Sequence, residues 1–112
     1  MGKVIVTGGR NYSDRNFIYQ TLDHFKPTEI INGGASGADR ISTEYAKERN
    51  IPLKIYNADW DFYGRSAGPV RNELMLSENS DAIVLAFAGG KGTQDCVTRA
   101  IVKKMKIYHE MR

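Results

Sequence analysis

The chain has 112 residues, of which 41% are hydrophobic, 10% aromatic and 26% charged, and its formal net charge is +3. These values fit one globular domain with a packed core and exclude a disordered chain, while the small positive charge favours anionic ligands without requiring nucleic acid. The longest apolar run, residues 82–88, is too short to cross a membrane, and the N-terminus has no signal-peptide pattern. The single cysteine cannot form an internal disulfide, and no Cys/His cluster has zinc spacing. We therefore predict a cytoplasmic, single-domain protein over residues 1–112, without metal, cofactor or membrane contact.

Short apolar runs rich in β-branched residues alternate with longer segments of helical period, which predicts an α/β fold with a parallel sheet flanked by helices. Strands are predicted at residues 3–7, 28–32, 52–56, 82–87 and 106–108. Helices are predicted from Ser13 or Asp14 to the residue before Pro27, and at residues 37–49, 67–79 and 92–104. The apolar residues expected to face the core from the last two helices are Val70, Leu74, Met75, Val97, Ala100 and Ile101.

The connection at residues 57–68 (NADWDFYGRSAG) is longer than is usual between such elements. It contains three aromatic side chains, Trp60, Phe62 and Tyr63, and a cation, Arg65. An aromatic ring can stack on a base, and an arginine can pair with a phosphate. The alternative is a hydrophobic flap that covers the core, and we favour the functional interpretation.

Three predicted strand-to-helix connections are rich in glycine: TGGRNY (7–12), NGGASGAD (32–39) and AGGKGTQD (88–95). In a right-handed parallel α/β sheet these connections emerge at the same carboxyl edge. Glycine lets backbone amides approach an anion and the following helix adds partial positive charge, although tight turns also need glycine. The neighbouring side chains that favour an anion site are Arg10, Arg65, Arg71 and Thr93. Because neither G-x-x-x-x-G-K-[ST] nor G-x-G-x-x-G fits these loops, an ordinary P-loop NTPase or dehydrogenase is disfavoured.

Four segments carry a family resemblance: VTGGRNYSD, INGGASGAD, ADWDFYGRSAGPVRNELM and AFAGGKGTQDCV. In this order they resemble the YspA-core branch of the SLOG superfamily, small Rossmann-like proteins related to Lonely Guy-type phosphoribohydrolases and to DprA. The resemblance covers nearly the whole chain. It implies a five-stranded parallel sheet of order 3-2-1-4-5 with helices on both faces, and a nucleotide-type ligand at the carboxyl edge.

The resemblance also implies site residues. Residues 89–93 match the G-G-x-G-T phosphate-binding segment of the superfamily, and residues 33–39 match its other glycine loop. Arg71 takes the place of an arginine that begins an Arg-Lys pair in Lonely Guy-type enzymes, and Asn72 follows it here. The predicted ligand-binding residues are Gly8, Gly9, Arg10, Gly33, Gly34, Ala35, Ser36, Gly37, Asp39, Trp60, Arg65, Arg71, Asn72, Gly89, Gly90, Gly92, Thr93 and Asp95.

One position departs from the enzymes of the superfamily. Lonely Guy-type enzymes carry a glutamate three residues after the threonine of G-G-x-G-T, where this chain has Cys96. Cleaving an N-glycosidic bond develops positive charge on the ribose, which a carboxylate stabilises and a neutral thiol does not. Cys96 is either a reactive thiol or, as we favour, a small buried apolar residue. If the protein is an enzyme, the candidate carboxylates are Asp95, Glu73 and Asp39; Asp39 alternatively complements a helix N-terminus or accepts hydrogen bonds from ribose hydroxyls.

The leading functional hypothesis is therefore a protein that binds a nucleotide or nucleotide-derived molecule, an ADP-ribose-like or cyclic nucleotide signal, as a sensor or by sequestration. Small proteins of this kind also occur in phages. The alternative is a nucleotide phosphoribohydrolase. Binding of single-stranded nucleic acid ranks third, because the sequence shows no extended basic stripe. A homo-oligomer is expected from the open sheet and the resemblance, through either Val102 and Met105 or Met75 and Leu76.

Overall fold

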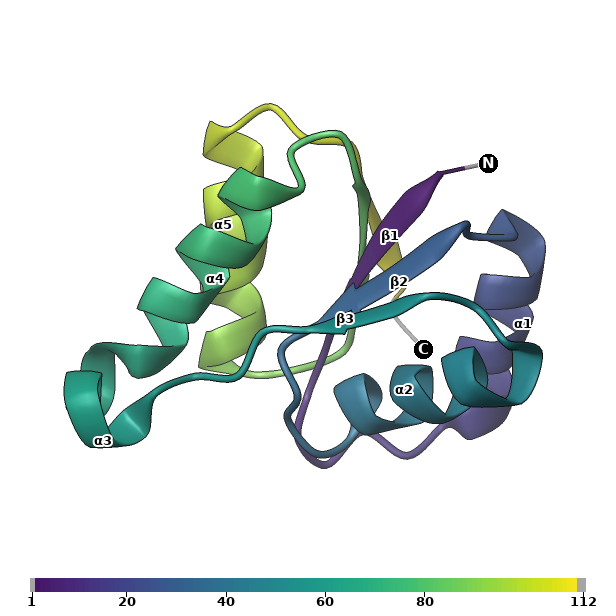
Figure 1. The fold of residues 1–112 in the computed structure, drawn as a ribbon, viewed down its shortest axis with the longest axis horizontal. Coiled ribbons are helices and arrows are strands. Elements are labelled where there is room, and N and C mark those ends of the chain that lie inside the picture. Colours follow the sequence, from purple (N-terminus) through teal and green to yellow (C-terminus); the bar gives the residue numbers. More distant parts are fainter. Residues whose placement is uncertain (1, 111–112) are drawn as a thin grey trace.

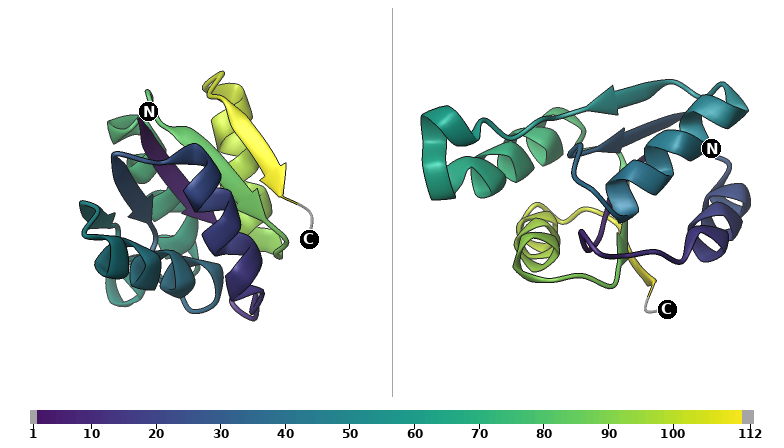
Figure 2. Two further views of the ribbon diagram at one scale, coloured as in Figure 1. Left: turned by 90° about the vertical axis from the view of Figure 1, so that its right-hand side faces the viewer. Right: turned by 90° about the horizontal axis from the view of Figure 1, so that it is seen from below.

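The computed structural model describes residues 2–110 as one five-stranded sheet with helices on both faces (Figures 1 and 2). In chain order the elements are β1 (Lys3–Thr7), α1 (Arg15–Phe25), β2 (Glu29–Asn32), α2 (Ala38–Arg49), β3 (Leu53–Ile55), α3 (Trp60–Tyr63), a 3-10 turn (Gly64–Ser66), α4 (Ala67–Glu78), β4 (Ile83–Phe87), α5 (Lys91–Val102) and β5 (Ile107–Glu110). Neighbouring strands pair in parallel in the order β3-β2-β1-β4-β5. The predicted fold class and strand order are confirmed. No helix between residues 2 and 110 has the length and apolarity that crossing a bilayer requires.

Two apolar layers lie on opposite faces of the sheet, because successive strand residues point to opposite sides. On β1, Val4 and Val6 join the layer beneath α1 and α2, whereas Ile5 joins the layer beneath α4 and α5. Both β1 and β4 are buried almost throughout, as expected for central parallel strands. The chain leaves β1 toward β2 on one side and returns to β4 on the other, so the carboxyl ends of β1 and β4 form a topological switch point, where α/β sheets bind ligands (Figure 1).

The burial predicted for the last two helices is partly wrong. Val70 and Leu74 are 38% and 49% exposed, and Ile101 is 60% exposed. The residues that these two helices do bury are Ala67, Gly68, Asn72, Met75, Leu76, Cys96 and Ala100. A polar residue, Asn72, lies on the inner face of α4, so apolarity alone assigned the helix the wrong orientation. Since Met75 and Leu76 are 2% and 0% exposed, they are also unavailable for contact between copies of the chain.

The long connection between β3 and α4 is partly helical. Asp59 caps α3 by accepting a hydrogen bond from the Phe62 N–H at 3.1 Å, and the 3-10 turn then leads directly into α4. The three aromatic side chains of this segment, Trp60, Phe62 and Tyr63, are 51%, 76% and 44% exposed. The interpretation as a hydrophobic flap over the core is therefore wrong.

Candidate functional site

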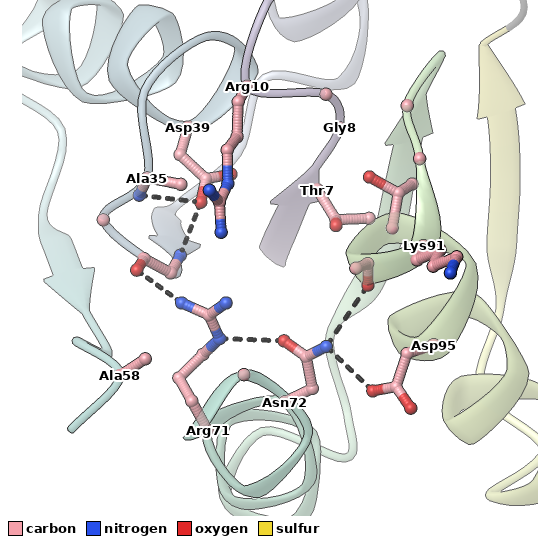
Figure 3. Close-up of a pocket in the computed structure, with 18 of the residues that line it drawn as sticks. Thr7, Gly8, Arg10, Ala35, Asp39, Ala58, Arg71, Asn72, Lys91 and Asp95 are labelled. Atoms are coloured by element: carbon pink, nitrogen blue, oxygen red, sulfur yellow. Dashed lines mark hydrogen bonds between the residues drawn. The ribbon is translucent and has the colours of Figure 1, made fainter. Parts of the chain in front are cut away.

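A cleft of about 1560 Å³ opens at the carboxyl edge of the sheet. The three glycine-rich loops after β1, β2 and β4 form its walls together with α3 and α4 (Figure 3). All of the residues predicted to bind a ligand line it, except Gly37, which lies behind the loop surface. The structure thus brings these residues together, while their contact with a ligand remains a prediction.

The glycines of the three loops divide into two groups. Gly37 has a φ of +75°, and a Cβ there would lie 2.1 Å from the Gly9 carbonyl oxygen, so the first two loops pack backbone against backbone. The Gly9 N–H in turn donates to the Ala88 carbonyl at 2.9 Å, which joins the first loop to the third. By contrast, a Cβ at Gly90 or Gly92 would meet no atom within 4 Å. Packing within the described chain therefore requires the first group of glycines but not the second.

Asp39 organises the loop after β2. Its Oδ2 accepts hydrogen bonds from the backbone N–H groups of Gly33 and Ala35, each at 3.2 Å (Figure 3). The residue is only 6% exposed. Burial raises the pKa of the Asp39 carboxyl to about 6, although the two N–H groups and the nearby Arg71 guanidinium act in the opposite direction. The Asp39 carboxylate thus holds the loop through two hydrogen bonds and places a charge at the wall of the cleft.

The helices α2 and α5 both begin at the cleft with a glycine N-cap, and neither cap supplies a side-chain acceptor. In the loop before α2, however, three backbone N–H groups already donate to side chains of the protein. Those of Gly33 and Ala35 donate to Asp39, and that of Gly34 donates to Asn32 Oδ1 at 2.9 Å. At α5 the N–H groups of residues 91–93 belong to the first turn, which has no intrahelical acceptors. The start of α5 is therefore the more suitable of the two ends for an anion.

Arg71 and Asn72 connect the second and third loops through α4. Arg71 Nη1 donates to the Gly33 carbonyl at 2.6 Å, and its Nε donates to Asn72 Oδ1 at 2.8 Å. Asn72 Nδ2 donates to Asp95 Oδ2 at 3.0 Å and to the Gly92 carbonyl at 3.3 Å. Figure 3 shows the remaining guanidinium nitrogen of Arg71 turned toward the open centre of the cleft. Asn72 thus orients Arg71, and both its amide oxygen and its amide nitrogen are hydrogen-bonded within the protein.

The three candidate carboxylates have different surroundings. Asp39 and Asp95 line the cleft, and Asp95 Oδ2 also accepts from Arg99 Nε at 3.0 Å. Glu73 lies outside the cleft, where Arg99 and Lys103 pair with it. The hydrogen bond from Lys103 is the main reason that the pKa of Glu73 is lowered. This placement gives no support to Glu73 as a carboxylate of the site.

Cys96 lies in the apolar layer beneath α4 and α5 and is 1% exposed. Burial raises the pKa of its thiol to about 11, a change that the Thr7 hydroxyl opposes. The thiol therefore stays protonated at neutral pH, and the residue packs as a small apolar side chain. Cys96 therefore does not supply the carboxylate that Lonely Guy-type enzymes carry at the corresponding position.

The outer rim carries an arginine and an aromatic ring from distant parts of the chain. The Arg10 guanidinium carbon lies 6.0 Å from the centroid of the Trp60 ring. Trp60 and Arg65 line the cleft, whereas Tyr63 does not and instead packs edge-on against Phe62. Of the three aromatic side chains in residues 57–68, Trp60 is therefore the one that offers a surface for a base in the cleft.

Sequence reasoning missed several residues that line the cleft: Val6, Thr7, Asn11, Tyr12, Asn57, Ala58, Gly68, Pro69, Met75, Ala88 and Lys91. Some of them carried a usable signal. Thr7 ends β1 and Asn57 follows β3 by two residues, so both belong to the carboxyl edge. Lys91 adds a cation at the first residue of α5, which leaves the cleft with four cationic side chains and two carboxylates.

Comparison with known proteins agrees with this architecture. The profile of the YspA, cpYpsA-related SLOG family (YAcAr) matches residues 2–63, which include the first two glycine loops and the aromatic side chains of Trp60, Phe62 and Tyr63. The chain belongs to this SLOG family. The resemblance stated from the sequence motifs is thereby confirmed.

Relatives of this SLOG protein extend the likeness to the rest of the chain. Gene 61 protein of Mycobacterium phage D29 is 33% identical over 89% of each chain. The X-ray structure of TM1055, a structural genomics target, has a TM-score of 0.73 at 19% identity and covers 96% of this chain and 72% of its own. DNA processing protein A (DprA) from Streptococcus pneumoniae has a TM-score of 0.75 at 14% identity, covering 97% of this chain and 50% of its own. The two structures share the fold, and membership of the SLOG family is consistent with a nucleotide-related function.

Proposed function

We propose that this SLOG protein binds a nucleotide or nucleotide-derived molecule, such as an ADP-ribose-like or cyclic nucleotide signal, as a sensor or by sequestration. The observation that carries the proposal is the start of α5. There, Gly90 and Gly92 have open space where a Cβ would lie, and the first-turn N–H groups lack intrahelical acceptors. A phosphate fits this position because it accepts those hydrogen bonds and meets the positive end of the helix dipole.

The charges around the cleft favour one direction for the ligand. Lys91 lies in the first turn of α5, where the charge of Asp95 is paired with that of Arg99. The remaining guanidinium nitrogen of Arg71 faces the open centre of the cleft, and Asp39 places negative charge on the wall at the start of α2. A phosphate beside Asp39 would meet a like charge. We therefore place the phosphate at α5, the sugar toward Asp39, and the base on the exposed ring of Trp60, where stacking is worth about 1–3 kcal/mol.

Binding is tested by native mass spectrometry of the purified protein for a retained ligand, and by calorimetry. The calorimetric panel comprises nucleoside monophosphates, cyclic dinucleotides and NAD derivatives, and chromatography follows each titration. We expect at least one compound to bind and to be recovered intact, and we expect Arg71→Ala to weaken its binding. The matched control is Arg40→Ala, because Arg40 is exposed on α2 and does not line the cleft. If no compound in the panel binds and none is retained, the proposal is wrong.

Hydrolysis of the ligand is the second candidate function. Asp95 favours it, because this carboxylate lines the cleft and its side chain is 29% exposed. Against it, Asn72 and Arg99 both donate to Asp95 Oδ2, and the buried thiol of Cys96 offers no carboxylate. Release of a free base that disappears in Arg71→Ala would favour the hydrolase over the binding protein.

Sequestration is a plausible role for a protein with a phage relative, because binding alone keeps a signal molecule from its receptor and no bond needs to be cleaved.

We also propose that copies of the chain associate through the outer face of α4 and α5. This face exposes four large apolar side chains, Val70, Leu74, Ile101 and Val102.

A further inference from the structure

Asp39 has hydrogen-bond capacity that the protein does not use. Both backbone donors bind the same oxygen, Oδ2. No fully buried side-chain oxygen or nitrogen in the described part of the chain lacks a hydrogen-bond partner. Because no donor among residues 2–110 reaches Oδ1, this oxygen is open to the cleft that Asp39 lines.

An ionised carboxylate accepts hydrogen bonds and donates none. Its natural partner in a ligand is a hydroxyl or an N–H group, and a second phosphate would be repelled. Arg71, whose charge acts on Asp39, donates to Gly33 and to Asn72 rather than to this oxygen. A buried carboxylate that a ligand covers without supplying a donor carries the full desolvation penalty.

We propose that Asp39 Oδ1 accepts a hydrogen bond from the vicinal hydroxyls of a ribose, which makes the cleft selective for ribonucleotides over 2′-deoxyribonucleotides. The inference rests on the proposed function, with the phosphate at α5 and the sugar between the two walls. The burial that raises the pKa of Asp39 to about 6 is the same burial that makes an unpaired charge there costly. At neutral pH the carboxylate is mostly ionised and is an acceptor for the sugar hydroxyls.

The test compares the four ribonucleoside monophosphates with their 2′-deoxy counterparts by calorimetry at pH 7.5. We expect the ribonucleotide of the best-binding base to bind about 10- to 100-fold more tightly than its 2′-deoxy form, the usual effect of one hydrogen bond to a charged group. Equal affinities would overturn the inference and leave the proposed function intact. If none of the eight compounds binds, the inference fails as well, and the panel described above decides separately whether the proposed function survives.

A substitution locates the effect at Asp39. Asp39→Asn can still accept the Gly33 and Ala35 N–H groups through its amide oxygen, so the loop keeps these two hydrogen bonds. We expect the preference for ribose to fall to about 3-fold, because a hydrogen bond to a neutral amide is weaker than one to a carboxylate. The 2′-deoxy form should bind the variant no more weakly than it binds the wild type. Asp81→Asn is the control, since Asp81 pairs with Lys3 at the opposite edge of the sheet and should keep the full preference. A full preference that persists in Asp39→Asn would overturn the inference.

Discussion

At the scale of single residues, the glycines of the three loops are required for two different physical reasons. Gly37 has a left-handed φ of +75° and no room for a side chain, so the fold itself requires glycine there. Gly92 lies in the first turn of α5 and has no atom within 4 Å of an added Cβ. Glycine lowers the stability of a helix relative to alanine. A bound phosphate would explain glycine at this position, because it would occupy the space that a Cβ takes.

Alanine at each position separates these two reasons. We expect Gly37→Ala to lower the free energy of unfolding by about 2–3 kcal/mol, because it combines backbone strain with a clash against the Gly9 carbonyl. Gly92→Ala should raise it by about 0.5 kcal/mol and should weaken ligand binding. Urea unfolding and calorimetry measure the two effects. A Gly92→Ala protein that binds the ligand as tightly as the wild type would contradict the phosphate position.

Asp39 predicts a pH dependence of stability. Burial raises the pKa of Asp39 in the folded protein from its ordinary value of 3.8 to about 6, so the folded protein binds the proton more tightly than the unfolded chain. The stability that this proton contributes is fully present below about pH 4 and is lost as the pH rises through about 6. We expect the wild type to be about 1 kcal/mol more stable at pH 5 than at pH 8, as measured by urea unfolding. Asp39→Asn should lack this part of the difference, and an unchanged difference in the variant would contradict the assignment.

At the scale of elements, α4 is the link between the walls of the cleft. Asn72 in α4 joins Arg71 to the start of α5, and Asn79, at the C-cap of the helix, donates to the Tyr56 hydroxyl at 3.1 Å. Both asparagines are buried, at 4% and 2% exposure. Polar residues thus fix the orientation of a helix whose exposed apolar residues indicated a different one.

Asn72→Ala should lower the free energy of unfolding by about 1–3 kcal/mol, because Arg71 Nε and the acceptors at α5 lose their partner. It should also weaken ligand binding, because Arg71 loses one of the contacts that orient it. Glu73→Gln on the same helix is the control: its ion pairs are half-exposed and screened by solvent, so we expect a much smaller change in stability and unaltered binding. Urea unfolding and calorimetry check both. Equal effects of the two substitutions would rule out Asn72 as the positioning residue.

At the scale of the whole molecule, the sheet is covered on both faces, and the covering helices α4 and α5 expose the apolar side chains of Val70, Leu74, Ile101 and Val102. We expect a homo-oligomer in solution and expect Leu74→Lys to shift it toward the mass of one chain, measured by light scattering after gel filtration. Ile55→Lys is the matched control, since Ile55 is 40% exposed on the edge strand β3, away from this face. A wild-type protein that elutes as a single chain at all concentrations would contradict the association.

The sequence by itself determined the order of the elements, the parallel sheet and the three loops of the cleft, because these depend on local periodicity and on glycine positions. It also indicated that Cys96 is buried. Only the tertiary structure decided that Asp39 occupies the amides of the second loop, that Glu73 lies outside the cleft and that α4 turns Asn72 inward. These outcomes depend on hydrogen bonds between distant residues, such as that between Arg71 and Gly33, 38 positions apart. Periodicity does not encode such partners, because packing chooses them once the helices are in place.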